Sequence, residues 1–205
     1  YHMIKAYRDV DSLTPMVAVS IDDLGAGVNA IKTVTVPTAT ATDAGVLALY
    51  VGGRRYQVGV ASADDQDAVA LSIIAAVNAD SSAVVTAAAG AASNVVNLTA
   101  KNKGTVGNQI DVRTNYNDTE ALPPGIVQPT FAVLTAGSGD PDVQEILDVI
   151  PDDHYNFVVF PWTDSANLNA IRTEAEERNG PTKQVEMMGV TSNADTVGNQ
   201  TTRSE

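Results

Sequence analysis

The sequence contains no cysteine and few aromatic residues. Of 205 residues, none is cysteine, one is tryptophan, and 5% are Phe, Trp or Tyr. The lack of cysteine excludes disulfides, zinc–thiolate sites and thiol catalysis. Alanine, valine and threonine dominate the apolar residues, which suits thin β-rich layers and suits a haem or flavin pocket poorly. We therefore expect no cofactor, no metal and no catalytic residues.

Basic residues are also scarce. The chain has 12 Lys and Arg against 25 Asp and Glu, a net charge of −13. An acidic surface repels nucleic acid and anionic lipid, so we expect no nucleic acid and no membrane as partners. The acidity suits either contact with basic neighbours or plain solubility, and solubility is the simpler explanation. No apolar run approaches the roughly 18 residues of a membrane-spanning helix, and no signal peptide is evident.

Residues 30–117 carry the pattern of a small β-rich domain. Ala30–Pro37 alternates, and two β-prone runs, Gly45–Val51 and Arg54–Val60, meet at Gly52-Gly53, which predicts a hairpin. Ser62 is the predicted cap of a helix that ends near Asn78. The buried stripe of that helix is predicted to comprise Val69, Ala70, Ile73, Ile74 and Val77.

Three further strands complete this segment. They are predicted at Ala83–Ala88, Val95–Ala100 and Ile110–Tyr116. Gly104 and Gly107 lie in the polar connector before the last strand. The connector contains neither GxxxxGK[ST] nor GxGxxG before a helix, so a shaped loop is favoured over a phosphate site.

The following residues predict a different pattern. Asp118–Thr130 is rich in proline and reads as a linker, and after it come alternating strands and helices. Strands are predicted at Phe131–Thr135, Asn156–Phe160 and Gln184–Val190. The middle strand is a continuous apolar run, typical of a strand covered on both faces. Helices are predicted after Asp140-Pro141 and over Ser165–Asn179, and the β-α-β-α-β order favours a parallel sheet.

These patterns together predict an α+β fold in which a small β-rich domain with one helix is inserted into an α/β scaffold domain. We place the scaffold at residues 15–29 and 118–190 and the insertion at 30–117. The short apolar run Met16–Ile21 is predicted to be a strand of the scaffold sheet. We expect residues 191–205 to be a polar C-terminal extension that leads to a further part of the protein.

Several motifs, in this order and spacing, carry a resemblance to a known family. They are GVLALYVGGRRYQVGVASADDQDAVA (Gly45–Ala70), LTAKNKGTVGNQIDVRTNYN (Leu98–Asn117), LPPG (Leu122–Gly125), LTAGSGDPD (Leu134–Asp142), FPWTD (Phe160–Asp164) and RNGP (Arg178–Pro181). Together they resemble the tail sheath protein of Mu-like contractile-tailed phages and prophages, from about Val17 to Val190.

The resemblance implies a structural protein and no enzyme. Sheath subunits stack around the tail tube and rearrange during contraction, which drives the tube through the host envelope. The implied partners are other copies of the full-length subunit, the tail tube protein and the baseplate. The implied location is the virion tail, and the host cytoplasm during assembly. The chain would be a fragment lacking the N-terminal start and the C-terminal domain, and we expect it alone to be a monomer or weak oligomer. Tight, concentration-independent hexamers would contradict this.

Two clusters could carry chemistry instead. In Asp152-Asp153-His154, the histidine could act as a general base oriented by a carboxylate, or the residues could bind a metal ion together. An exposed turn before the next strand explains the same residues. Phe160–Asp164 follows a strand, where open α/β sheets bind ligands, but an aspartate before a helix is simply a cap. An alternative function is therefore a small hydrolase or phosphotransferase that uses Asp153, His154 and Asp164.

The remaining candidates are surface sites. Oxygens of Asn115, Asn117, Asp118 and Glu120 could bind calcium, but their spacing lacks the glycine and distal glutamate of the EF-hand loop, which favours a turn. A carbohydrate-binding module is a second alternative. Such modules usually present aromatic rings on which a sugar stacks, and the β-rich segment offers Tyr50, Tyr56 and Tyr116. Tyr50 and Tyr56 are predicted to be core residues, which weighs against this alternative. The main basic residues either meet acidic patches on neighbouring subunits or are ordinary solvated charges; they are Arg54, Arg55, Lys101 and Lys103.

Overall fold

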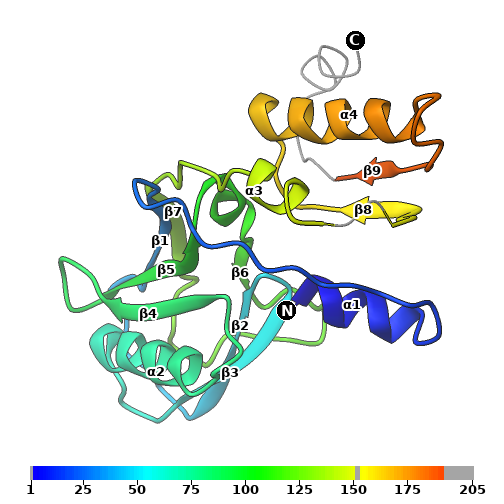
Figure 1. Ribbon diagram of the computed structural model, residues 1–205. Coiled ribbons are helices and arrows are strands. Elements are labelled where there is room, and N and C mark those ends of the chain that lie inside the picture. Colours follow the sequence, from blue (N-terminus) through cyan, green and yellow to red (C-terminus); the bar gives the residue numbers. More distant parts are fainter. Residues whose placement is uncertain (1, 151–152, 192–205) are drawn as a thin grey trace.

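A computed structural model describes residues 2–150 and 153–191. It is a mixed α+β structure with a large β-rich region and a smaller region in which a helix covers a short sheet (Figure 1). The elements in chain order are α1 (His2–Val10), β1 (Asn29–Thr35), β2 (Gly45–Val51), β3 (Arg54–Val60), α2 (Gln66–Asn78), β4 (Val85–Ala89), β5 (Val95–Lys103), the 3₁₀ helix η1 (Thr105–Gln109), β6 (Val112–Thr114), β7 (Thr130–Thr135), α3 (Gln144–Leu147), β8 (Phe157–Val159), α4 (Ser165–Asn179) and β9 (Met188–Val190).

Two antiparallel sheets form the β-rich region. One has the strand order β4-β5-β1-β7 and the other the order β3-β2-β6. The predicted hairpin is confirmed, since β2 and β3 have the predicted bounds and pair from Gly45–Val60 to Val51–Arg54. The predicted alternation is visible in β1, where Ala30 and Val34 are buried while Ile31, Thr33 and Thr35 are only partly buried.

The main core lies between these sheets and α2. It is built mostly from valine, leucine and isoleucine, and burying one such side chain stabilises a fold by about 1.5–3 kcal/mol. The helix contributes Val69, Ala70, Ile73 and Val77, the stripe that its sequence predicts, while Ile74 is only partly buried. The strands contribute Val34, Leu47, Leu49, Val51, Val58, Val85, Val96 and Leu98.

The helix α2 begins later than predicted. Its N-cap is Asp65, whose side chain accepts hydrogen bonds from the backbone amides of Asp67 and Ala68. Ser62 instead donates to the carbonyl oxygen of Thr42 at 3.3 Å. The reason is local: Asp64 accepts from the amide of Ala61, which closes a turn before the helix, and Ala63 has a positive φ of 70°.

Because Asp65 and not Ser62 is the N-cap of α2, substitutions at these two residues should differ in their effect on stability. Asp65→Ala removes an N-cap and should lower the free energy of unfolding by about 1 kcal/mol, whereas Ser62→Ala should cost clearly less. Urea unfolding followed by circular dichroism measures both variants against the parent chain. Equal losses for the two variants would show that the cap is not Asp65.

The smaller region is a βαβ unit with a short helix beside it. Strands β8 and β9 pair in parallel, as the element order predicts, and α4 between them has the predicted bounds. Asp164 is the N-cap of α4 and accepts from the amide of Asn167 at 3.0 Å. A second apolar cluster joins α3, β8 and α4 through Val143, Leu147, Phe160 and Ile171.

Three predictions about the scaffold sheet are wrong. Met16–Ile21 is not a strand: it has no ladder partner, and Val17 and Val19 are exposed. Strand β7 does not join β8, because it pairs with β1 of the β-rich sheet. The middle strand is not covered on both faces, since Phe157 and Val159 on one face of β8 are exposed.

Smaller differences concern the ends of elements. The predicted strand Ile110–Tyr116 is shorter, because η1 precedes it and only Val112–Thr114 pair with β2. Asp140 does not cap α3, whose N-cap is Val143. The helix α1 is not among the elements that the sequence analysis predicts. No helix in the described ranges is long and apolar enough to cross a membrane.

The division into a scaffold and an insertion remains a prediction. The two parts of the predicted scaffold do touch, because Val28 forms an isolated antiparallel bridge with Ser138. Apart from Thr191, the C-terminal extension lies outside the described residues, as does Asp152.

Candidate functional site

Three segments that are distant in sequence meet beside the β-rich sheet. They are residues 23–28, 103–109 and 137–140, and we call them together the clasp. The second contains GTVGNQ and the third contains GSGD, both parts of the motifs that carry the resemblance. Each segment is bound to another by hydrogen bonds, and the bonds run through polar side chains as well as backbone.

Asp140 is the residue that joins η1 to the third segment. Its carboxylate accepts hydrogen bonds from the backbone amide and the hydroxyl of Thr105, each at 2.6 Å. Gly104 makes room for this contact: its φ is +99°, and a Cβ there would collide with Oδ1 of Asp140. The geometry therefore explains why a glycine precedes Thr105 and why an aspartate follows the second glycine of GSGD.

The other bonds of the clasp are reciprocal. Asn108 donates through Nδ2 to the carbonyl oxygen of Gly137 at 2.9 Å, and its Oδ1 accepts from the amide of Gly137 at 2.7 Å. Asp23 accepts from the amide of Lys103 at 2.9 Å, while the ammonium of Lys103 donates to the carbonyl oxygen of Gly25 at 2.8 Å. These side chains therefore fix backbone and leave little capacity for a ligand.

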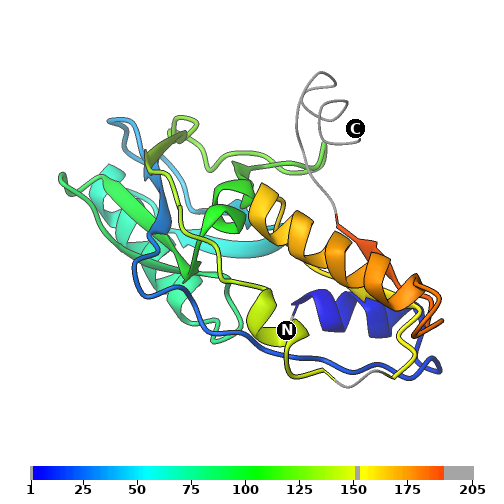
Figure 2. The same ribbon diagram turned by 45° about the horizontal axis from the view of Figure 1, so that its top comes forward.

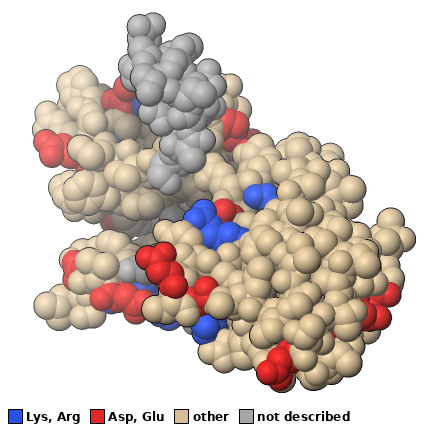
Figure 3. Space-filling view, turned by 180° about the vertical axis from the view of Figure 1, so that it is seen from behind, with Lys and Arg blue, Asp and Glu red and all other residues tan. Residues whose placement is uncertain are grey.

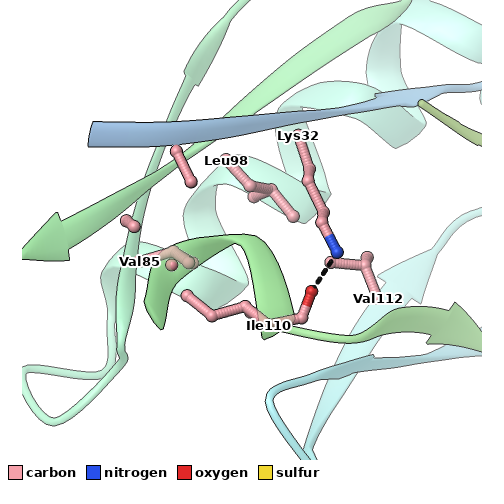
Figure 4. Close-up of a pocket in the computed structure, with 8 residues that line it drawn as sticks. Lys32, Val85, Leu98, Ile110 and Val112 are labelled. Atoms are coloured by element: carbon pink, nitrogen blue, oxygen red, sulfur yellow. Dashed lines mark hydrogen bonds between the residues drawn. The ribbon is translucent and has the colours of Figure 1, made fainter. Parts of the chain in front are cut away.

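A small cavity adjoins η1 within the β-rich region. Figure 4 shows Lys32 reaching from β1 across the cavity to the carbonyl oxygen of Ile110, to which it donates a hydrogen bond. The cavity measures about 10 Å³, and apart from Lys32 its walls are apolar or backbone. A space of this size holds at most about one water molecule, so it is no substrate pocket.

A polar network lies on the outer face of the three-stranded sheet. Glu120 accepts hydrogen bonds from the hydroxyl of Tyr50 at 2.7 Å and from Nε of Arg55 at 2.6 Å. Asn117 donates to the Tyr50 hydroxyl at 2.7 Å, and the ring of Tyr116 lies 4.8 Å from the guanidinium carbon of Arg113. Asn117 and Glu120, which were weighed as calcium ligands against a turn, therefore serve as hydrogen-bonding partners that hold the chain after β6 against the hairpin.

The network changes the pKa of its acids. Burial acts to raise the pKa of Glu120, but hydrogen bonds from Tyr50, Arg55 and the Asn117 amide outweigh it and lower that pKa to about 2. For Tyr50, burial and the bond to Glu120 both raise the pKa. Glu120 is therefore charged and Tyr50 neutral at physiological pH, as the bond between them requires.

The lowered pKa predicts how stability depends on pH. The charged form of Glu120 stabilises the fold above its ordinary pKa of 4.5, and that stabilisation is lost as pH falls toward about 2. Glu120→Gln should therefore be less stable than the parent chain at neutral pH. The difference should narrow below pH 4.5 when unfolding by urea is measured across the range.

The control for this experiment is Asp118→Asn, because Asp118 is an exposed carboxylate two positions away. Because the side chain is exposed, the substitution should leave the free energy of unfolding within about 0.5 kcal/mol of the parent chain. If the difference in free energy of unfolding between Glu120→Gln and the parent chain stayed constant down to pH 2, the lowered pKa of Glu120 would be contradicted.

The residues of the hydrolase alternative do not converge. Asp153 and His154 are exposed and precede β8, whereas Asp164 follows β8 and caps α4. The strand lies between them, so they are at its opposite ends, and a strand advances about 3.3 Å per residue. Within the described ranges, no three His, Cys, Asp or Glu side chains are grouped to hold a metal ion.

The main basic residues have partners within the chain. Arg54 pairs with Asp80 at 2.8 Å and Arg55 with Glu120 at 2.6 Å. The ammonium of Lys101 donates to the carbonyl oxygen of Ser81 at 3.0 Å. Figure 3 shows that Asp and Glu lie mainly around the rim of one face, whereas much of the Lys and Arg lies toward its middle.

Of the two tyrosines that were predicted to be core residues, one is buried in the core and the other is not. Tyr56 is buried in the core, as predicted, and its hydroxyl donates to Asp80 at 3.1 Å. Burial and this bond raise its pKa to about 12. The prediction for Tyr50 is wrong, because Tyr50 lies on the outer face in the network with Glu120, where its polar end keeps partners.

Two buried polar residues were missed. Arg178 of the RNGP motif is 1% exposed; it donates to Glu174 at 2.6 Å and to the carbonyl oxygen of Asp153 at 3.1 Å. Asn167 links α3 to α4, since it accepts from the amide of Val143 and donates to the carbonyl oxygen of Pro141. Both residues lie on the same side of the predicted helix Ser165–Asn179 as its buried Ile171. A polar residue at such a position is the sequence signal that could have identified them.

Comparison with known proteins defines the class. Residues 25–128, half of the chain, match the family described as "Phage tail sheath protein beta-sandwich domain". The chain therefore belongs to the phage tail sheath family, which confirms the resemblance stated from the motifs.

A curated relative specifies the type. The chain is 32% identical over 184 residues to the Mu-like prophage FluMu tail sheath protein of Haemophilus influenzae. The match covers 90% of this chain and 37% of the relative, so the chain spans little more than a third of that protein's length.

The solved structures that were matched are only distantly similar to this chain. The flagellar cap protein FliD D2-D3 domains from Escherichia coli are 15% identical, with 62% of this chain and 78% of that chain covered at a TM-score of 0.30. The corresponding domains from Serratia marcescens give 18% identity, coverages of 61% and 83%, and a TM-score of 0.23. Likeness at this level does not define a fold.

Proposed function

We propose that this chain is part of a structural subunit of a Mu-like contractile tail sheath. The subunit stacks around the tail tube and rearranges during contraction to drive the tube through the host envelope. Its partners are other sheath subunits, the tail tube protein and the baseplate. It acts in the virion tail and is present in the host cytoplasm during assembly.

The clasp is the observation that supports this proposal most directly. Polar residues of the GTVGNQ and GSGD motifs are hydrogen-bonded to backbone in other segments, as Asp140 is to Thr105 and Asn108 is to Gly137. Side chains used in this way fix the shape of a domain and are not available to react with a substrate. A subunit that transmits movement between its neighbours needs such a fixed shape.

The membership of the family supports the same role, and the site geometry disfavours the enzyme alternative. Asp153, His154 and Asp164 lie at opposite ends of β8, so no nucleophile, base and binding site come together there. We further propose that the β-rich region faces outward in the sheath, since a compact domain would crowd the side next to the tube.

An antiserum raised against this chain tests the proposal on purified tails. It should recognise a major tail polypeptide longer than this chain on an immunoblot. By immunogold electron microscopy it should label extended tails along their whole length, and the labelled zone should shorten in contracted tails.

Two controls make the result decisive. Pre-absorption of the antiserum with the purified chain should remove the label, and particles without tails should carry none. Label confined to the capsid or the tail tip, or a polypeptide absent from tails, would contradict the proposal.

A further inference from the structure

The small parallel sheet exposes an apolar face. Phe157 is 67% exposed and its ladder neighbour Met188 is 58% exposed, while Val159 and its neighbour Val190 are 49% and 40% exposed. These four side chains form what we call the open face. Parallel sheets normally have both faces covered, because their crossover helices or other elements pack on them.

The opposite face of the same sheet is closely packed. Phe160 is buried there, and at Gly189 a Cβ would lie 2.7 Å from Cγ2 of Ile171 on α4. The helix α4 therefore packs closely against this side of the sheet at β9. The contrast shows that the open face is the side that still needs a cover.

The helix α1 lies on that side. Figures 1 and 2 both place α1 beneath β8 and β9, away from α4. Ile4, Tyr7 and Val10 fall along one side of the helix, and Lys5 pairs with Asp9 on the other at 2.8 Å. Tyr7 is 38% and Val10 is 91% exposed, so the apolar stripe of α1 is also incompletely covered.

A helix of nine residues is not stable in water without packing. Its apolar stripe therefore needs a surface, and the open face offers one within the same chain. The tether allows the movement: residues 11–28 contain no helix or ladder strand, and Leu13 and Val17 on it are exposed. The far end of the tether is fixed, because Val28 is bound at the clasp.

We propose that α1 is the second cover of the small sheet and closes onto the open face through Tyr7 and its apolar stripe. Closure produces an α/β/α arrangement with α4 and α1 on opposite sides. It places apolar side chains against Phe157, Val159, Met188 and Val190 and leaves Lys5 and Asp9 in water. This inference concerns the chain alone and does not depend on the proposed function.

Disulfide trapping tests the proposal cleanly, because the chain has no cysteine of its own. The double variant Tyr7→Cys/Phe157→Cys places one thiol on the stripe and one on the open face. The matched control, Lys5→Cys/Phe157→Cys, moves the first thiol to the opposite side of the same helix. Both are oxidised at low protein concentration, and products are separated on a non-reducing gel.

The stripe pair should form an intramolecular disulfide at least about tenfold faster than the control pair, since closure gives it a high effective concentration. Equal rates for the two pairs would overturn the proposal. Disulfides that form only between molecules would also overturn it, because the open face would then be a contact between copies.

A single-thiol measurement guards against misfolding of the double variants. The thiol of Phe157→Cys should react faster with an alkylating reagent when Tyr7→Lys is also present, because a charged residue weakens closure. Lys5→Gln is the control and should leave the rate unchanged. If Tyr7→Lys has no effect either, α1 does not cover the open face.

Discussion

The hydrogen bonds from Thr105 to Asp140 are the contact on which the clasp depends. They connect η1, which follows β5, to the segment that follows β7, so they fix the ends of two strands that flank β1 in the same sheet. Charge-assisted bonds of this kind are about twice as strong as neutral ones. The neighbouring contacts of Asn108 with Gly137 and of Val28 with Ser138 rely on the same placement of the third segment.

This constraint explains how the two regions of the chain are joined. The path from β7 to α3 runs through the clasp, so the position of the smaller region is set where Asp140 is held. The path from α1 to β1 also ends there, at Val28. The βαβ unit and the N-terminal helix are therefore both connected to the β-rich region through the clasp.

Local signals in the sequence predicted much of the fold. The Gly52-Gly53 hairpin, the stripe of α2 and the whole of α4 are short-range patterns, and each is confirmed. Pairing between distant segments could not be predicted: the period of Phe131–Thr135 predicts a strand but does not say which sheet it joins, and in the structure it pairs with β1. Asp140 followed by Pro141 has the pattern of a helix cap, and nothing nearby in the sequence shows that Thr105 takes its carboxylate.

The most direct test of the clasp is the stability of Asp140→Ala, with Asp118→Ala as the control at an exposed carboxylate. Both are compared with the parent chain by urea unfolding, and amide hydrogen exchange is followed at Val28 and Gly137. Loss of the Thr105 bonds should lower the free energy of unfolding by about 1–3 kcal/mol and speed exchange at both amides, while the control stays within about 0.5 kcal/mol of the parent. An Asp140→Ala variant as stable as the control, with unchanged exchange, would contradict the account.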